Sequence, residues 1–417
     1  LMNSHLKRLD NFLNSDIKPL VSLFRKTLND CPNVDNLYLV GGTIRDVIMG
    51  KRASDPDFAI SGDINEFVTH LQKNVNFRLE YHPQFINAQI HFDQFNFSVD
   101  ISSLRSETYP SPGALPVVTQ IMDINEDLKR RDFTVNAIGL DITKQNNLKL
   151  FDPHNGLEDI RTKTIRVLHK KSFQDDPTRL FRAVRYSIYK DLEIETTTRI
   201  LVKSSLKFLK DVSKDRVNKE LIKLISGPNI KKHLNLAKHL GILRTVDPQS
   251  TIMTEFDEAL EPLPDDLLVR LGVLLSAATE TQILDILSSL GFTNNIRSKL
   301  RNIPKTKILC SSLSAKKINP SKIKLVCEKI PSEILESHKV LCGYSMCKTA
   351  IERYLSVYKI IKADLNGNEI IKLGVPPGPK VKSVLDLLLE NKLDGKLKSK
   401  KASTEYVRDL VKKNQFD

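Results

Sequence analysis

The chain has 417 residues, of which 40% are hydrophobic and 27% charged, and this composition is typical of a folded protein with more than one domain. A formal net charge of +14 favours a polyanionic partner, while no apolar run approaches the roughly 20 residues of a membrane-spanning helix, so we expect a cytoplasmic protein. The five cysteines, an odd number without a CxxC pair, favour reduced core thiols over a disulfide framework or a zinc knuckle.

The first third of the chain mixes helical and strand patterns. Apolar spacing predicts helices over residues 6–28, 43–49 and 65–73. Alternating or continuous apolar runs predict strands over residues 37–40, 58–60, 77–80, 88–92, 95–101 and 135–142. Residues 105–116 contain three prolines and a glycine and are predicted to form a loop.

The pattern changes after about residue 150, and strand signals become scarce. Helical spacing covers residues 180–189, 197–206, 216–225, 230–240, 265–276 and 280–290. The predicted fold class is therefore α+β, with an α/β head built on a mixed sheet and an all-helical remainder. We divide the chain into a catalytic head, a helical neck, a helical body and a helical tail, over residues 1–148, 149–229, 230–330 and 331–417.

The segment Leu37–Phe58 joins a strand, a pair of glycines, a short helix and a second acidic strand. Gly41 and Gly42 leave the backbone without Cβ atoms, so that phosphates can approach its N–H groups. Asp55 and Asp57 are two residues apart, which on a strand turns both carboxylates to one face. Such a pair can share two Mg²⁺ ions, although an isolated DxD pair is also common in solvated turns.

A third acid is expected in the same place. Asp100 stands between apolar neighbours on a predicted strand, where a buried carboxylate needs a metal or a hydrogen-bond partner. The alternative is an acid that caps a strand end. The Gly41–Gly42 segment is not a phosphate-binding P-loop, because Arg52 follows Gly50 and Lys51.

Six motifs in order resemble the class II CCA-adding enzyme and bacterial poly(A) polymerase family of the polymerase-beta-like nucleotidyltransferases. They occur over about residues 37–243, and residues 374–395 carry a weaker likeness to the tail of bacterial members. The motifs are GGTIRDVIMG with DPDF, VDISSLRSETYPSPGALP, RRDFTVNAIGLDI, LFDPHNGLEDI, DDPTRLFRAVRYSI and DRVNKELIKLI. Pro56 departs from the family, which usually has an apolar residue with a free N–H between the two aspartates.

The resemblance implies roles for individual residues. Asp55, Asp57 and Asp100 would be the catalytic metal ligands. Asp176 and Arg179 would read the base of the incoming nucleotide, while Asp176 alone also fits a helix N-cap. The nucleotide-binding set would be Gly41, Gly42, Arg45, Arg130, Arg131, Asp132, Asn136, Asp176, Arg179, Arg182 and Arg185. The flexible loop of the family would include Arg105, Glu107 and Tyr109.

The activity implied by the resemblance is template-independent addition of C and A from CTP and ATP to the 3′ end of tRNA, with two Mg²⁺ ions. The alternatives are an A-adding or CC-adding enzyme, a poly(A) polymerase, and a non-catalytic RNA-binding relative. We expect the body and tail to bind tRNA, because residues 301–330 hold eight Lys or Arg against one acid, Glu328. A solvated helix face is the alternative for any single lysine.

Overall fold

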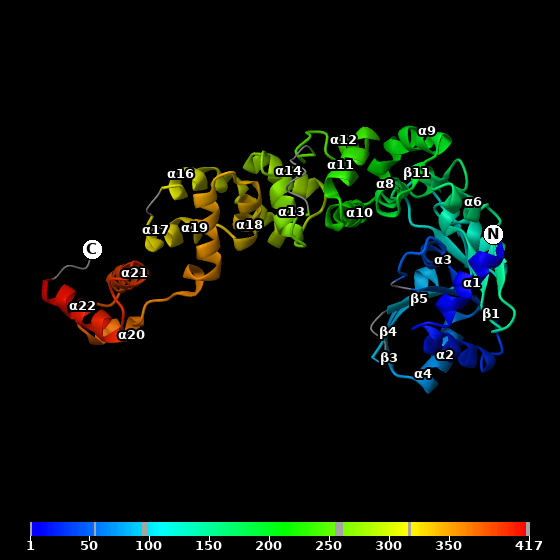
Figure 1. Cartoon of the computed structure of the whole chain (residues 1–417), viewed down its shortest axis with the longest axis horizontal. Helices are drawn as coiled ribbons and strands as arrows, with labels where there is room; N and C mark the ends of the chain where they lie inside the picture. The colour runs from blue at the N-terminus through cyan, green and yellow to red at the C-terminus, as the bar shows by residue number, and fades with distance from the viewer. Residues whose placement is uncertain (1, 54–55, 94–97, 255–261, 316–317, 414–417) are drawn as a thin grey trace. The chain divides into compact units, whose positions relative to one another are not determined.

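The computed structural model describes residues 2–53, 56–93, 98–254, 262–315 and 318–413 (Figure 1). The chain divides into two compact units. Unit 1 comprises Leu1–Gly227 and Lys232–Val246, and unit 2 comprises Pro228–Lys231 and Asp247–Asp417. The α+β class is confirmed, since a mixed sheet near the N-terminus is followed by a largely helical remainder. This division is coarser than head, neck, body and tail, whose boundaries stay a prediction.

A seven-stranded sheet forms the centre of unit 1, in the order β3-β4-β5-β2-β1-β8-β9. Its strands are β1 Val34–Val40, β2 Asp57–Gly62, β3 Phe77–His82, β4 Asn87–Phe92, β5 Ser98–Ser103, β8 Gly139–Asp141 and β9 Lys149–Phe151. Strands β2 and β5 are parallel, whereas the other neighbours are antiparallel. Two further strands, β6 Arg105–Thr108 and β7 Val117–Gln120, form a separate antiparallel hairpin.

Helices cover both faces of the sheet. The helices of this region are α1 Met2–Leu13, α2 Lys18–Asn29, α3 Gly42–Ile48, α4 Ile64–Asn74 and α5 Ile124–Lys129. On one face, Phe24 of α2 packs edge-on against Phe58 of β2 and Phe67 of α4. On the other face, a core that includes Val40, Ala59 and residues of α5 is buried. Asp57 shares this second face with Ala59, because alternate strand residues point the same way.

The structure corrects three local predictions. The expected helix over residues 6–28 is two helices, separated at residues 14–17 ahead of Pro19, which lies in the first turn of α2. The expected loop over residues 105–116 begins with strand β6. The expected strand over residues 135–142 is a short 3₁₀ helix, η2 Thr134–Asn136, followed by β8.

The rest of unit 1 is mainly helical. Its helices are α6 Gly156–Arg161, α7 Ser172–Asp175, α8 Arg179–Lys190, α9 Thr196–Ser205, α10 Lys214–Ser226, α11 Ile230–His239, of which the first two residues belong to unit 2, and α12 Ile242–Val246. Strands β9, β10 Thr164–Ile165 and β11 Glu193–Ile194 are exceptions to the expected all-helical neck, and β10 and β11 form a two-residue parallel pair. Lys190 at the end of α8 donates to Asp46 of α3 at 2.9 Å, which ties α8 to the head.

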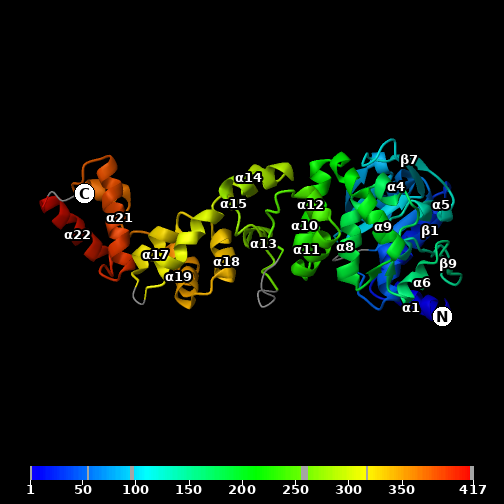
Figure 2. The ribbon, with the colours of Figure 1, turned by 90° about the horizontal axis from the view of Figure 1, so that it is seen from above.

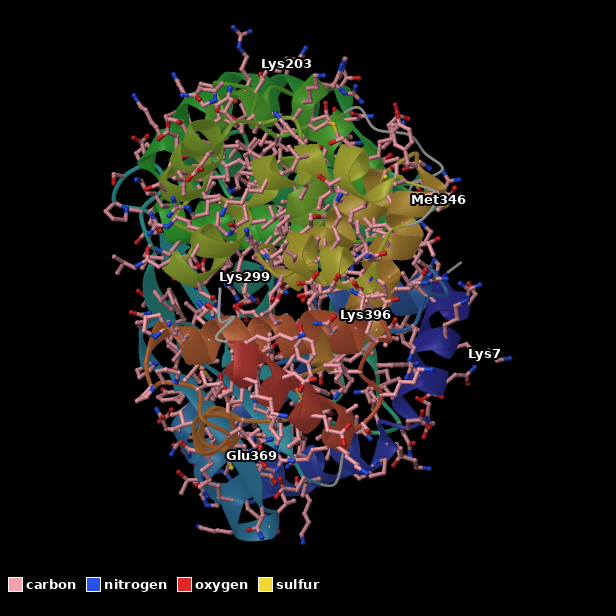
Figure 3. The ribbon with its side chains drawn as sticks, turned by 90° about the vertical axis from the view of Figure 1, so that its left-hand side faces the viewer. Lys7, Lys203, Lys299, Met346, Glu369 and Lys396 are labelled. Atoms are coloured by element: carbon pink, nitrogen blue, oxygen red, sulfur yellow. The ribbon has the colours of Figure 1, made fainter. Side chains whose placement is uncertain are left out.

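Unit 2 consists of short helices that follow one another and pack side by side (Figure 2). They are α13 Leu267–Leu274, α14 Glu280–Ser289, α15 Asn294–Leu300, α16 Leu309–Leu313, α17 Pro320–Cys327, α18 Ser332–Leu341, α19 Ser345–Ser356, α20 Gly367–Lys372, α21 Pro379–Leu393 and α22 Lys400–Lys413. The last three share an aliphatic core around Ile370, Val384 and Val407. Of the lysines of unit 2 labelled in Figure 3, Lys396 is exposed, whereas Lys299 donates to Glu333 at 2.7 Å.

Among the described residues, every helix is too short or too polar to cross a bilayer.

Candidate functional site

A cavity of about 390 Å³ opens in unit 1 beside the end of β1. Six arginines and four carboxylates line it, so its surface is suited to a polyanion. It brings together nine of the predicted nucleotide-binding residues, namely Gly41, Gly42, Arg130, Arg131, Asp132, Asn136, Asp176, Arg179 and Arg182. Asp57 and the loop residues Arg105, Glu107 and Tyr109 line the same cavity.

Gly41 marks the point where β1 ends and α3 begins. Its φ of +70° lies in the region that favours glycine. A Cβ atom at Gly41 would lie 2.8 Å from Arg131 Nη1 and 3.3 Å from Asp57 Oδ2. The missing side chain therefore lets the Arg131 guanidinium and the Asp57 carboxylate approach the same piece of backbone. The approach of phosphates to this backbone stays a prediction.

Two predicted metal ligands occupy neighbouring strands of the sheet. Asp57 on β2 and Asp100 on β5 are register partners in a parallel pair, which places them on one face. The Asp57 N–H donates to Thr43 Oγ1 at 3.1 Å, and Gln89 Nε2 donates to Asp100 Oδ1 at 3.3 Å. Asp55 lies outside the described residues. Two carboxylates beside a polar cavity provide the oxygen ligands that Mg²⁺ prefers, so the residues present fit such an ion.

The strand that carries Asp57 begins at Asp57 itself, one residue after Pro56. The missing N–H of this proline therefore falls ahead of the ladder and costs no hydrogen bond within it. The departure from the usual family pattern leaves the strand intact.

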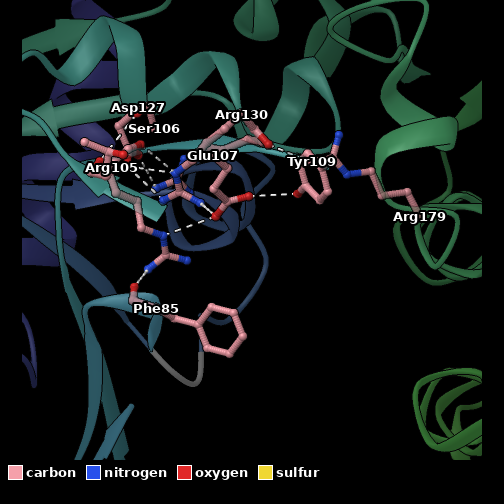
Figure 4. A network of polar contacts seen from close by, with 10 residues as sticks. Phe85, Arg105, Ser106, Glu107, Tyr109, Asp127, Arg130 and Arg179 are labelled. Carbon is pink, nitrogen blue, oxygen red and sulfur yellow. Dashed lines mark hydrogen bonds and ion pairs between the residues drawn. The ribbon is translucent and has the colours of Figure 1, made fainter. Parts of the chain in front are cut away.

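A buried carboxylate that the sequence analysis did not select holds the two central arginines. Asp127 Oδ1 accepts from Arg130 Nε and Nη2 at 3.0 and 2.8 Å (Figure 4). Asp127 Oδ2 accepts from Arg131 Nη2 at 3.1 Å. Burial alone would raise the pKa of Asp127, yet Arg130 and Arg131 hold it below its ordinary value. Asp127 is therefore ionised and fixes both guanidinium groups at the cavity wall.

The hairpin contributes a second carboxylate to this network. Glu107 Oε1 accepts from Arg130 Nη1 at 2.9 Å and from Arg105 Nε at 3.2 Å, while Oε2 accepts from the Tyr109 hydroxyl at 2.8 Å (Figure 4). Arg105 Nη1 also donates to the Phe85 carbonyl at 2.6 Å. Burial opposes ionisation of Glu107, but Arg130 and Arg105 lower its pKa overall. The predicted loop residues Arg105, Glu107 and Tyr109 are thus linked to Arg130 through the Glu107 carboxylate.

Asp132 and Asn136 form a third group on the cavity wall. Arg182 Nη2 lies 2.7 Å from Asp132 Oδ2, and Asn136 Nδ2 donates to Asp132 Oδ1 at 2.9 Å. Burial would raise the pKa of Asp132, but Arg182 and the Asn136 amide lower it. Arg45 is buried, and its Nη1 donates to Asn136 Oδ1. Its Cζ atom lies 5.0 Å from the centre of the Tyr186 ring.

Asp176 and Arg179 stand at the start of α8. Arg179 donates to the Arg130 carbonyl and to Ser172 Oγ, both at 2.7 Å. Asp176 Oδ1 accepts from Thr178 N and Oγ1 at 3.0 and 2.6 Å and from Arg216 Nη2 at 2.8 Å. All three contacts involve Oδ1 of Asp176. Asp176 can therefore hold the turn before α8, whose N-cap residue is Thr178, and also contact a ligand in the cavity.

Three predicted site residues do not line the cavity. Arg45 is buried behind Asn136, Asp100 lies beside Asp57 on the next strand, and Arg185 pairs with Glu220 at 3.1 Å. Conversely, Tyr186 and Arg216 line the cavity although the sequence analysis assigned them no ligand contact. The helical spacing of Tyr186 from Arg182 and Arg179 was a signal that could have identified it.

Comparison with known proteins agrees with this arrangement. The poly(A) polymerase head domain family matches residues 37–166, and the family described as a probable RNA- and SrmB-binding site of polymerase A matches residues 191–252.

Two relatives are A-adding tRNA nucleotidyltransferases. That of Geobacter sulfurreducens is 28% identical over 95% of this chain and 46% of its own length. That of Halalkalibacterium halodurans is 28% identical over 91% of this chain and 90% of its own length. A solved CCA-adding enzyme without ligand is 25% identical, with a TM-score of 0.77 over 96% of this chain and 97% of its own. The chain belongs to the class II CCA-adding and tRNA nucleotidyltransferase family, with poly(A) polymerase head and RNA-binding domains.

Proposed function

We propose that this chain transfers nucleotides from CTP and ATP to the 3′ end of tRNA and releases pyrophosphate. The observation that carries the proposal is the cavity in which Asp57, paired in register with Asp100, faces a wall of arginines. Carboxylates on one side and guanidinium groups on the other match a reaction that needs metal-bound phosphates and a stabilised leaving group.

Asp57 and Asp100, together with Asp55, would hold the two Mg²⁺ ions. When bound, these ions lower the pKa of the attacking hydroxyl and neutralise charge on the phosphates. The protein contributes the geometry, because the two strands keep the carboxylates on one face before any ligand arrives.

Arg130 and Arg131 would bind the triphosphate. Their guanidinium groups are oriented by Asp127, and planar guanidinium groups match phosphate oxygens in two-point contacts. Asp132 is already held by Arg182 and Asn136, and it would accept from a ribose hydroxyl with little rearrangement.

Asp176 and Arg179 would select the base. An ionised Asp accepts from the exocyclic amine that C and A both carry, whereas U and G present a carbonyl at that position. The side chains are fixed by Thr178, Arg216 and Ser172, so they form a rigid template. When the wrong base enters a rigid site, the fixed polar groups of the site are left without partners, and this cost rejects that base.

The body and tail, residues 230–330 and 331–417, would bind the tRNA backbone through exposed basic side chains. Lys305, Lys307, Lys322 and Lys329 of the basic segment are exposed, and Lys316 and Lys317 lie outside the described residues. Lys324 is different, because it is 6% exposed and donates to the carbonyls of Tyr358, Lys359 and Ile361. It is therefore better suited to holding helices together than to binding phosphate.

We further propose that the chain adds C as well as A. The second candidate is an enzyme that adds only the terminal A, and it is favoured by the two A-adding relatives that cover nearly the whole chain. The test uses two tRNA substrates, one ending at the discriminator base and one ending in CC, each with CTP alone, ATP alone and both. Failure of CTP incorporation with normal ATP incorporation on the CC-ended tRNA would establish the second candidate.

A further inference from the structure

Four side chains of unit 2 that can bind a metal ion lie close together, and in sequence they are far from the residues that line the cavity of unit 1. They are Cys310, His338, Cys342 and Cys347, whose ligand atoms all lie within 4.8 Å of one another. Cys310 Sγ is 3.4 Å from His338 Nε2 and 3.2 Å from Cys342 Sγ. We propose that these residues form a structural zinc site.

The distances are close to those around a tetrahedral ion. Zinc binds thiolate sulfur at about 2.3 Å and imidazole nitrogen at about 2.0–2.1 Å, so two sulfur ligands in a tetrahedron are about 3.8 Å apart and a sulfur and a nitrogen about 3.5 Å apart. The Cys310–His338 distance nearly equals the second value, whereas the Cys310–Cys342 distance is about half an ångström shorter than the first. Small outward shifts of these side chains would make room for the ion.

The helices bring these ligands together from three elements. His338 and Cys342 are four residues apart at the C-terminal end of α18, a spacing that puts both on one side of a helix. Cys347 lies in the first turn of α19, and Cys310 lies in α16, which packs against α19 (Figure 1). Met346, one residue before Cys347, is 43% exposed and points outward in Figure 3, whereas Cys347 is fully buried.

The chemistry of the four ligands indicates which metal ion the site would bind and whether the ion would be structural or catalytic. Three thiolates and one imidazole are soft ligands that suit Zn²⁺ and do not suit Mg²⁺. Four protein ligands leave no position for water or substrate, so the site would be structural and not catalytic. On binding, the three thiols lose their protons to solvent and the imidazole ligates in its neutral form.

A disulfide accounts for the cluster less well. It would use only two of the three thiols and would leave the imidazole without a role, whereas the ion engages all four side chains. The five cysteines of the chain are free thiols.

The ion would stabilise a part of unit 2 built from very short helices. Helix α16 has five residues, too few to be stable without tertiary contacts. Cys310 and His338 also bracket the segment that carries Lys322 and Lys329. The ion would thus hold the chain on either side of Lys322 and Lys329, at Cys310 and His338. The consequence for tRNA binding rests on the proposed function.

The first test is the metal content of the untagged full chain, purified with a thiol reductant and without chelator. We expect one zinc ion per chain, and Co²⁺ exchange should give the visible bands and thiolate charge-transfer absorption of a tetrahedral site. Cys347→Ser should lose the zinc, whereas the control Cys327→Ser, which changes a buried cysteine outside the cluster, should keep it. Chelation of the wild type should lower Tm by several degrees, and zinc should restore it.

To separate metal loss from misfolding, His338→Cys offers a fourth thiolate and should keep zinc while shifting the Co²⁺ spectrum. Zinc-free wild type with five titratable thiols would overturn the proposal, and so would three titratable thiols, which would indicate a disulfide. Equal zinc content in Cys347→Ser and wild type would overturn it as well. These readouts are independent of nucleotide addition, so they succeed or fail separately from the proposed activity.

Discussion

Units 1 and 2 use different means to order polar side chains. In unit 1 a continuous sheet with a core of large aromatic residues holds the site, and buried carboxylates such as Asp127 and Asp132 fix arginines at the cavity wall. In unit 2 short helices share small aliphatic cores and keep most of their lysines in solvent. This difference is what we expect if unit 1 holds the proposed reaction centre, which needs fixed geometry, and unit 2 offers the proposed surface for a polyanion, which needs mainly charge.

Removal of a predicted metal ligand should impair the activity proposed for unit 1 without affecting the tRNA binding proposed for unit 2. Loss of a residue that only orients a ligand typically costs 10–100-fold, so Asp57→Asn should lower nucleotide incorporation by more than about a hundredfold. Binding of tRNA should stay within about twofold, because the phosphate contacts proposed for unit 2 are unchanged. The exposed Asp93→Asn serves as control. Near-normal turnover of the Asp57 variant, measured by single-nucleotide addition, would refute the metal assignment.

The hairpin can be tested by replacing residues 109–116 with an Asn-Gly turn, which keeps β6 paired with β7. The change removes Tyr109 from Glu107 and should abolish A addition while sparing C addition, if the enzyme adds C. The measurement is incorporation of each nucleotide on the two tRNA substrates described above. Unchanged A addition would rule out a role for the loop in accepting ATP.

The buried network predicts a stability effect that surface pairs do not share. Asp127→Asn should lower the free energy of unfolding by about 3 kcal/mol, because it leaves Arg130 and Arg131 without their buried partner. Asp215→Asn, which breaks an exposed pair with Lys219, should cost less than about 0.5 kcal/mol. Urea unfolding of both variants measures the contrast, and equal effects would show that the network contributes no special stability.

The same network has a defined pH dependence. Burial raises the pKa of Asp127, but the arginines lower it overall, so its folded-state pKa lies below the unfolded value. The stabilisation is therefore complete above the ordinary carboxyl range and is lost as the pH falls through the lowered pKa. The difference in Tm between wild type and Asp127→Asn should shrink in acid.

Base selection should change by a smaller factor. Asp176→Ala and Arg179→Ala should lower discrimination against UTP and GTP by about tenfold for each lost contact. Asp176→Asn sharpens the test, because its amide oxygen can still accept from Thr178 while the charge is gone. Addition of each of the four triphosphates should show altered preference in all three variants. Reduced rates with unchanged preference would mean that these residues only cap or brace α8.

The smallest effects are expected in unit 2. Lys322→Met should weaken tRNA binding slightly and reduce the slope of log Kd against log salt by about one. Lys324 lies two residues away on the same helix, but its ammonium group donates to three carbonyls. Lys324→Met should therefore lower Tm and leave the slope unchanged. Salt titrations of both variants compare a solvated lysine with a structural one. Equal slopes for Lys322→Met and wild type would remove Lys322 from the binding surface.

Local patterns predicted most of unit 1. The two-residue spacing of the acidic motif and the glycine pair at the end of a strand were sufficient to expect Asp57 and Gly41 at one site, since both depend on short-range geometry. The register of Asp57 with Asp100 could not be read from the sequence, because strand pairing is a tertiary property. Asp127 was missed although its spacing from Arg130 and Arg131 is helical, because the acid itself lies outside the family motif.

In unit 2 the sequence was less informative. Cys310 is 28 positions from His338, with helix α17 between them, and the absence of a CxxC pair counted against a zinc site. Lys324 belongs to a basic run in which only burial distinguishes it from its neighbours. Both features arise from packing between helices, which apolar periodicity does not specify.

The span of the cavity lining has a consequence for biosynthesis. Its wall combines Gly41 at the end of β1 with Arg216 of α10. A nascent chain therefore cannot complete the cavity before Arg216 has left the ribosome. During that interval the arginines near residue 130 lack α8 and α10, and contacts between such distant segments form late in folding. During translation this cavity is thus completed only after α10 has been synthesised.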